Sequence, residues 1–312
     1  MSVVINVPTV ISSQPGDEKD RFTRLFASQA GNATAQRAKV FLDEAGVSTL
    51  SALEEIISSI NFSGKDRNAV DTWIDVADAL RHVRRQTNAA NSRSWGIADR
   101  ICLALTENVS IDKKRRAKAS LFRAKIAHRS GRSHEVEGHV RQAFELNPHD
   151  AYSYIWASRF LGRFPDRRME SLRLAIRALT LAEEGDDREL LVRALLQRTR
   201  ATRGPEQTVY GRETVRVAKE FGDLKLMCDA LIACARSMRG SEQVAYGLDA
   251  LRIASEICDP RKECEALIVM ARGAHGQKQT EYLITADNIA RRIKDRSFRE
   301  QVRGIMGSSR KL

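Results

Sequence analysis

Apolar side chains recur at helical spacing along most of the chain, and no segment alternates convincingly between apolar and polar residues as a half-buried strand does. The segment from about residue 48 to residue 60 carries Leu50, Leu53 and Ile56 on one face. The same spacing predicts further helices over about 66–87 and 92–108. The pattern therefore predicts an all-α protein.

The first 110 residues divide into two parts. Residues 1–16 are rich in β-branched side chains and end at Pro15-Gly16, which predicts an extended arm before the first helix. Residues 17–110 have helical spacing but show no repeat period. We interpret them as an N-terminal helical bundle.

From about residue 180 onward the sequence repeats with a period of 36 residues. The recurring positions are Asp187, Asp223, Asp259 and Asp295; Ala182, Ala218, Ala254 and Ala290; Ala194, Ala230 and Ala266; Arg200, Arg236 and Arg272; Gly204, Gly240 and Gly276; Gln207, Gln243 and Gln279; and Tyr210, Tyr246 and Tyr282. Each Asp precedes an apolar run, where it can accept hydrogen bonds from the free N–H groups of a helix N-terminus. Each Gly follows that run, where a turn into a second helix favours positive φ. Helix pairs of this kind bury their apolar faces only by stacking on neighbouring pairs, which predicts a solenoid.

Residues 117–148 resemble a tetratricopeptide repeat. Gly131 lies at the turn between the two helices, and Val136 and Val140 lie at the small and bulky positions of the second helix. Pro148 closes the repeat. The repeats after residue 180 have two extra turn residues, which convert a 34-residue period into 36.

The first helix of this segment departs from the family, because Ser120 and Ala124 stand where the family has an aromatic residue and a glycine. The resemblance covers about residues 113–306 and implies a right-handed α-solenoid of stacked helical hairpins, with a partner-binding groove along the first helices. We therefore expect an extended arm (1–16), an N-terminal helical region (17–110), tetratricopeptide-like repeats (111–306) and a tail (307–312).

Positive charge is concentrated in the middle of the chain. The net charge of +12 divides into −1 for residues 1–110, +9 for residues 111–180 and +4 for residues 181–312. The densest basic stretch holds nine cations and no acidic residue: Lys113, Lys114, Arg115, Arg116, Lys118, Arg123, Lys125, Arg129 and Arg132. Two explanations are open, a solvated helix face or a surface for nucleic acid or an acidic partner, continued by arginines between residues 159 and 177.

Cations also recur near the ends of the first helices of the repeats. The candidate groove residues are Arg200, Arg203, Arg236, Arg239, Arg272 and His275. A row of arginines on adjacent helices can bind an acidic peptide or a phosphate backbone. The alternative is structural, because the macrodipole favours cations near a helix C-terminus without any ligand. We expect the recurring tyrosines to fill the space between helices.

The sequence shows no motif of an enzyme or of a metal site. It contains no phosphate-cradling glycine loop, nucleophile elbow or metalloprotease motif, and its five cysteines are spaced too widely for zinc. We expect no enzymatic activity, no cofactor and no metal. No apolar run reaches the ~18 residues of a membrane helix, and the start lacks the basic region of a secretory signal, so we expect a cytoplasmic protein without a membrane partner.

Two functions fit these features. The first is a non-enzymatic scaffold or adaptor that binds a protein or peptide, expected to be acidic, through the basic groove. The alternative is an RNA- or DNA-binding helical-repeat protein that uses the basic surface of residues 113–177. The N-terminal arm would also join a homo-oligomer if it packed in a neighbour's groove.

Overall fold

The structure, a computed structural model, describes residues 32–59, 67–81 and 88–309 together with Phe22 and Phe26. All regular secondary structure in these residues is helical, which confirms the predicted all-α fold. The predicted N-terminal arm lies outside the described residues. The chain divides into two compact units, Met1–His149 and Asp150–Leu312, and the four predicted regions remain a prediction.

The described part of the first unit consists of helices and their connections. The helices are α2 (Ala33–Glu44), α3 (Leu50–Ser59), α4 (Arg67–Arg81), α5 (Asn88–Glu107), α6 (Lys113–Arg129) and α7 (Ser133–Leu146). From α4 to α7 each helix packs on the next, while α2 packs on α4 and α3 packs on α5. Leu42, Leu53, Ile74, Ile97 and Ile101 are fully buried in one shared core.

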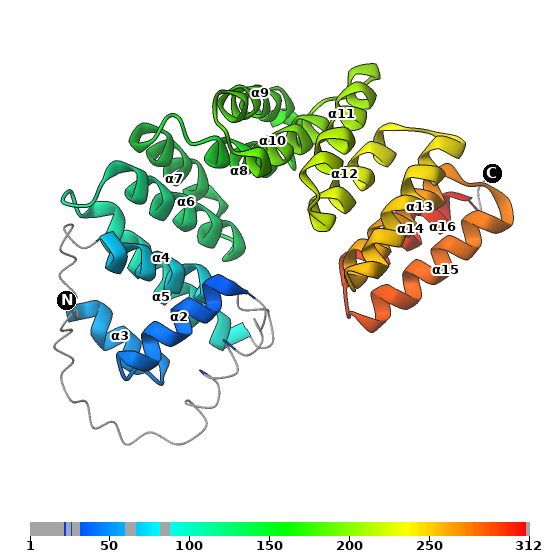
Figure 1. Cartoon of the computed structure of the whole chain (residues 1–312). Coiled ribbons are helices and arrows are strands. Elements are labelled where there is room, and N and C mark those ends of the chain that lie inside the picture. The colour runs from blue at the N-terminus through cyan, green and yellow to red at the C-terminus, as the bar shows by residue number, and fades with distance from the viewer. Residues whose placement is uncertain (1–21, 23–25, 27–31, 60–66, 82–87, 310–312) are drawn as a thin grey trace. The chain divides into compact units, whose positions relative to one another are not determined.

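The second unit is a stack of helical hairpins. Its helices are α8 (Ala151–Leu161), α9 (Arg168–Glu184), α10 (Arg188–Ala201), α11 (Pro205–Phe221), α12 (Leu224–Ser237), α13 (Gly240–Glu256), α14 (Pro260–Gly273), α15 (Gly276–Arg292) and α16 (Arg296–Ser309). Each helix packs against the next, and Figure 1 shows α10 to α15 as successive antiparallel pairs. The first helices of the pairs, α8, α10, α12, α14 and α16, also contact one another in a row. Helix α16 extends into the segment predicted as a tail.

The recurring aspartates begin the first helix of each pair, as the sequence predicts. The Asp187 carboxylate accepts a hydrogen bond from the backbone N–H of Leu190 at 2.9 Å, and Asp223 accepts one from Leu226 at 2.7 Å. The other two aspartates of the series cap α14 and α16 in the same way. Each cap of this type contributes about 1 kcal/mol to helix stability.

Small residues let the helices turn and approach one another. The recurring Gly204, Gly240 and Gly276 have positive φ values of 76°, 57° and 61°, which glycine adopts without strain. The recurring alanines are fully buried between helices. A Cβ atom on Gly247 in α13 would lie 2.4 Å from Cγ of Met270 in α14, so these helices approach more closely than an alanine permits without movement.

Candidate partner-binding groove

A groove with a volume of about 1010 Å³ follows the row of first helices in the second unit. Among the described residues that line it are seven cations, Arg159, Arg163, Arg200, Arg203, Arg236, Lys262 and Arg272, and two carboxylates, Asp229 and Glu265. The formal net charge of this lining is therefore +5. The structure brings together four of the six candidate groove residues.

The first two arginines of the 36-residue series face carboxylates of the following repeat. Arg200 Nη2 lies 3.6 Å from Asp229 Oδ1, and Arg236 Nη2 lies 3.1 Å from Glu265 Oε2. Each partner is 29 positions further along the chain, and the two carboxylates are themselves one period apart. The three recurring arginines are thus accompanied by two recurring carboxylates.

The third arginine of the series, Arg272, interrupts this pairing. The residue 29 positions after it is Gln301, a neutral amide that also lines the groove. In the described part of the chain no carboxylate lies within 4.0 Å of Arg272. Burial and the positive charge of Arg236 both lower the pKa of Arg272. This end of the groove therefore carries a cation that no carboxylate of the described residues pairs with.

Arg200 is a partly buried cation of the groove with a lowered pKa. Burial lowers its pKa to about 10, against the opposing effect of the Asp229 carboxylate. That carboxylate is shared, because Lys262 Nζ lies 2.5 Å from the same Oδ1 atom that is 3.6 Å from Arg200. The Arg200 guanidinium remains charged at neutral pH, and the shared Asp229 carboxylate only partly compensates its charge.

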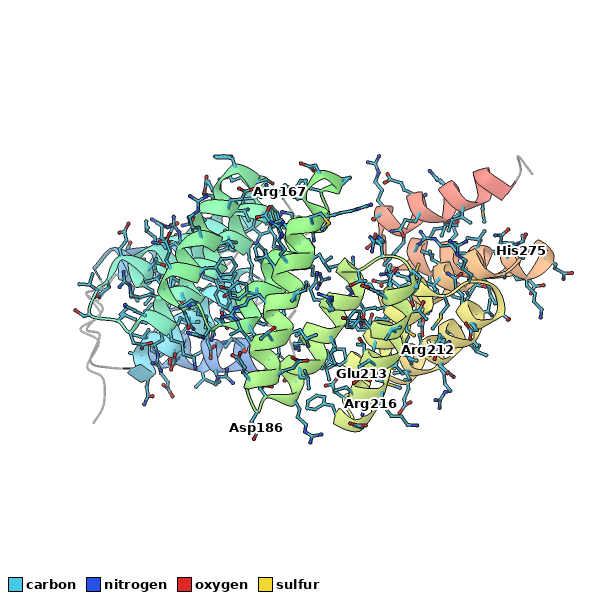
Figure 2. The ribbon with its side chains drawn as sticks, turned by 90° about the horizontal axis from the view of Figure 1, so that it is seen from above. Arg167, Asp186, Arg212, Glu213, Arg216 and His275 are labelled. Atoms are coloured by element: carbon cyan, nitrogen blue, oxygen red, sulfur yellow. The ribbon has the colours of Figure 1, made fainter. Side chains whose placement is uncertain are left out.

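Arg203, Arg239 and His275 are placed differently from the three arginines of the 36-residue series. The Arg203 guanidinium donates to the backbone carbonyls of Arg200 and Thr202, at 2.9 Å each, so it caps the end of α10 although it lines the groove. Arg239 and His275 precede α13 and α15, respectively, and are not among the groove residues. Figure 2 shows His275 at the start of α15. The macrodipole explanation therefore describes Arg203 better than it describes Arg200.

A buried glutamine with a free oxygen also lines the groove. The hydroxyls of Ser158 and Ser171 each donate to the other residue's backbone carbonyl, at 2.6 and 2.8 Å. Because the Ser158 proton is engaged, its oxygen accepts from Gln197 Nε2 at 2.9 Å. This network fixes the orientation of the Gln197 amide and leaves its Oε1 atom without a hydrogen-bond partner. The Gln197 side chain is only 4% exposed.

The recurring glutamines and tyrosines are used differently from repeat to repeat. Gln207 and Gln243 line the groove, whereas Gln279 donates to the backbone carbonyl of Ala271 at 2.9 Å. The ring of Tyr210 lies under the Arg198 guanidinium, 4.7 Å from its centroid. The other two tyrosines pack against the cores between helices, as predicted.

The basic stretch of residues 113–132 lies on α6 and the turn after it, where acids from other helices pair with it. Arg115 Nη2 lies 2.5 Å from Asp71, and Arg123 and Arg132 each lie 3.0 Å from Asp99. Hydrogen bonds to Asp71 and Asp112 raise the pKa of Arg115. These ion pairs join α6 and its turn to α4 and α5.

Further cations of the same stretch contact aromatic rings or a backbone carbonyl. The buried Lys125 lies 4.9 Å from the ring centroid of Phe122, and Arg129 lies 5.4 Å from that of Trp95. Lys118 lies 6.0 Å from the Phe122 ring, and Arg116 donates to a backbone carbonyl at 2.8 Å. The two remaining cations, Lys113 and Lys114, are exposed at the start of α6. The predicted surface of residues 113–177 includes residues of both units, and Arg159 and Arg163 of its second half line the groove.

The described residues contain no group of three or more His, Cys, Asp or Glu side chains that could hold a metal ion. Cys102, Cys228, Cys234 and Cys264 are buried, and Cys258 is exposed. Burial raises the pKa of the Cys228 and Cys264 thiols to about 12. Such a raised pKa is typical of buried cysteines that pack in a core and do not react. No described helix is both long enough and apolar enough to span a bilayer.

Sequence reasoning missed several groove residues for different reasons. Asp229, Glu265 and Gln301 occupy one position of the 36-residue repeat, but their residue types differ, so a search for identical residues does not find them. Lys262 is likewise one period from Phe298. Gln197 has no such signal, because a non-repeated contact with α8 places it. In comparisons with known proteins, neither a protein family nor a curated protein matches this chain.

Proposed function

We propose that this protein is a non-enzymatic scaffold or adaptor whose second unit binds an acidic segment of a partner protein in the groove. The observation that carries the proposal is the groove lining, in which seven cations face only two carboxylates. An interior ion-pair network would be close to neutral. An excess of five positive charges on one concave surface attracts an anionic ligand.

The arginines are suited to carboxylates because the planar guanidinium donates two parallel hydrogen bonds to such a group. Arg200 is incompletely compensated by Asp229, and the position 29 residues after Arg272 holds the neutral Gln301 in place of a carboxylate. A bound carboxylate would stabilise these two guanidinium groups in place of the water that burial removes from them. The spacing of the arginines, one per repeat, fits an extended segment with several acidic residues.

The nucleic-acid alternative has less support in the α6 half of its predicted surface, whereas Arg168, Arg173 and Arg177 of the other half are exposed. Most cations of the basic stretch on α6 contact Asp71, Asp99, a nearby aromatic ring or a backbone carbonyl. Lys113, Lys114 and Lys118 are the exposed cations of this stretch, which is few for a phosphate-binding surface. A nucleic-acid complex would show an affinity that falls by about 0.7 to 0.9 log units per log unit of salt for each phosphate neutralised.

Affinity purification from native cells, with and without nuclease, tests the proposal. The bait proteins are the wild type, a groove variant with Arg200→Gln, Arg236→Gln and Arg272→Gln, and a control with Arg193→Gln, Arg216→Gln and Arg291→Gln. The control removes the same charge from exposed arginines that pair locally with Glu189, Glu213 and Asp287. Figure 2 shows Arg216 beside Glu213 on α11.

We expect proteins with acidic segments to survive nuclease treatment, to bind the control and to be lost from the groove variant. The proposal is wrong if nuclease removes every captured component, or if the groove variant captures the same proteins as the wild type.

A further inference from the structure

We propose that the α8–α10 end of the groove is a subsite for a phosphorylated side chain of the bound peptide. This inference rests on the proposed function, because it names the anion that the most basic end of the same groove would take. Three guanidinium groups lie at this end, on Arg159, Arg163 and Arg200. Together with the buried amide of Gln197 they define the subsite.

The charge at this end exceeds what one carboxylate neutralises. Arg159, Arg200 and Lys262 line it together with the carboxylate of Asp229, so the formal charge of these four groups is +2. A glutamate or aspartate of a partner would leave +1. A phosphate monoester carries about −1.5 to −2 at pH 7 and offers three oxygens, so it neutralises nearly twice as much charge.

The three arginines are arranged as two rim groups and one deep group. Arg159 lies in the last turn of α8 and Arg163 follows that helix, and both are exposed. Arg200 lies in the last turn of α10, which packs on α8, and 26% of its side chain is exposed. Partial desolvation lowers the pKa values of Arg163 and Arg200, and the positive charge of Arg159 lowers both further. Cations that repel one another gain most from a ligand with two negative charges.

The free oxygen of Gln197 suits a phosphorylated peptide, because a peptide carries N–H donors beside its phosphate. Its Oε1 atom is a buried acceptor whose orientation is fixed by Ser158, so it can accept a hydrogen bond from an N–H or O–H group of a ligand. The oxygens of a phosphate dianion accept hydrogen bonds and cannot satisfy it. A backbone N–H beside a phosphorylated residue can. A phosphodiester backbone carries only one negative charge per phosphate, so it neutralises less charge at this end than a phosphate monoester does.

The test uses three libraries of nonapeptides with degenerate flanking positions and a fixed central residue, which is serine, glutamate or phosphoserine. Fluorescence anisotropy measures their binding to the full chain, and inorganic phosphate serves as a competitor. We expect the phosphoserine library to bind at least about tenfold more tightly than the glutamate library, and the serine library to bind most weakly.

Two variants locate the binding. Arg159→Gln changes an exposed side chain, so it should leave the fold intact and reduce the preference for phosphoserine over glutamate to less than about threefold. Gln197→Met should weaken the phosphoserine library about fivefold and leave competition by inorganic phosphate unchanged. Arg193→Gln is the matched control, because Arg193 lies on α10 but outside the groove and pairs with Glu189. Circular dichroism melting curves of each variant show whether it has folded.

The inference and the proposed function can fail separately. Equal binding of the glutamate and phosphoserine libraries, both lost in the groove variant, would overturn the phosphoryl subsite and keep the acidic-peptide groove. A preference for phosphoserine that persists in folded Arg159→Gln would also overturn it. If neither library binds and a single-stranded oligonucleotide does, both proposals are wrong.

Discussion

Replacing Arg200 by methionine should make the protein more stable, because the fold holds this guanidinium in a poorly compensated environment. Its pKa of about 10 is more than two pH units below the ordinary value, and each unit corresponds to 1.36 kcal/mol. The charged form is therefore disfavoured in the fold by roughly 3 kcal/mol. Both the folded and the unfolded chain are protonated at Arg200 at pH 7, so the full penalty is present there.

Methionine keeps an unbranched side chain of similar length and removes the charge. The substitution loses the 3.6 Å approach to Asp229, but Lys262 continues to pair with that carboxylate at 2.5 Å. After subtracting some lost packing, we expect the free energy of unfolding to rise by about 1 to 2 kcal/mol. The same variant should bind acidic peptides less well, as expected where function requires a strained site.

Urea denaturation followed by circular dichroism measures this change, provided that the slopes of wild type and variant agree. Arg236→Met is the comparison at the equivalent repeat position, where it removes the 3.1 Å ion pair with Glu265. Both partners of that pair are partly exposed, so the loss should be at most about 1 kcal/mol. If Arg200→Met lowers the free energy of unfolding by more than the Arg236 variant does, the desolvation reasoning is wrong.

Three further predictions concern the helix packing, the helix caps and the buried thiols. Gly247→Ala should destabilise the protein by about 1 to 2 kcal/mol, because the added Cβ would meet Met270. Gly138→Ala, in open space on α7, should stabilise it by about 0.5 to 1 kcal/mol. Thermal melting curves measure both changes, and equal effects would contradict the close approach of α13 and α14. Asp223→Ala should lower the free energy of unfolding by about 1 kcal/mol in the same assay, through loss of the α12 cap, and an unchanged value would show that the cap is not stabilising. In the folded protein Ellman's reagent should modify one thiol, that of Cys258, and after denaturation it should modify all five; more than one rapid reaction in the native state would contradict the buried positions.

The fold could be predicted from the sequence because each repeat carries its own signals. Asp187 and Asp223 mark helix starts, Gly204 and Gly240 mark turns, and the buried alanines mark contacts, so every element is indicated locally. Copies at a fixed period then predict stacking. The departures of the first helix at Ser120 and Ala124 did not prevent the hairpin from forming.

The candidate site was only partly predictable. The arginine ladder recurs and could be placed on the first helices, but the carboxylates opposite it are hidden by the change from Asp229 to Glu265 to Gln301. The basic stretch on α6 was judged by its own residues, whereas the acids that pair with it come from α4 and α5. Charge along a sequence therefore overstates charge on a surface when the compensating groups are distant in the chain.

The most direct test of the groove compares two variants that lose equal charge. A fluorescein-labelled oligoglutamate peptide is titrated with the wild type, with Arg236→Gln/Arg272→Gln, and with Arg216→Gln/Arg291→Gln, whose arginines lie outside the groove. We predict that the groove pair loses affinity at least about thirtyfold, as expected for two charge-assisted contacts, and that the outer pair loses less than about threefold. Equal losses in the two variants would show that net charge alone attracts the peptide, and would contradict a binding groove built by the repeats.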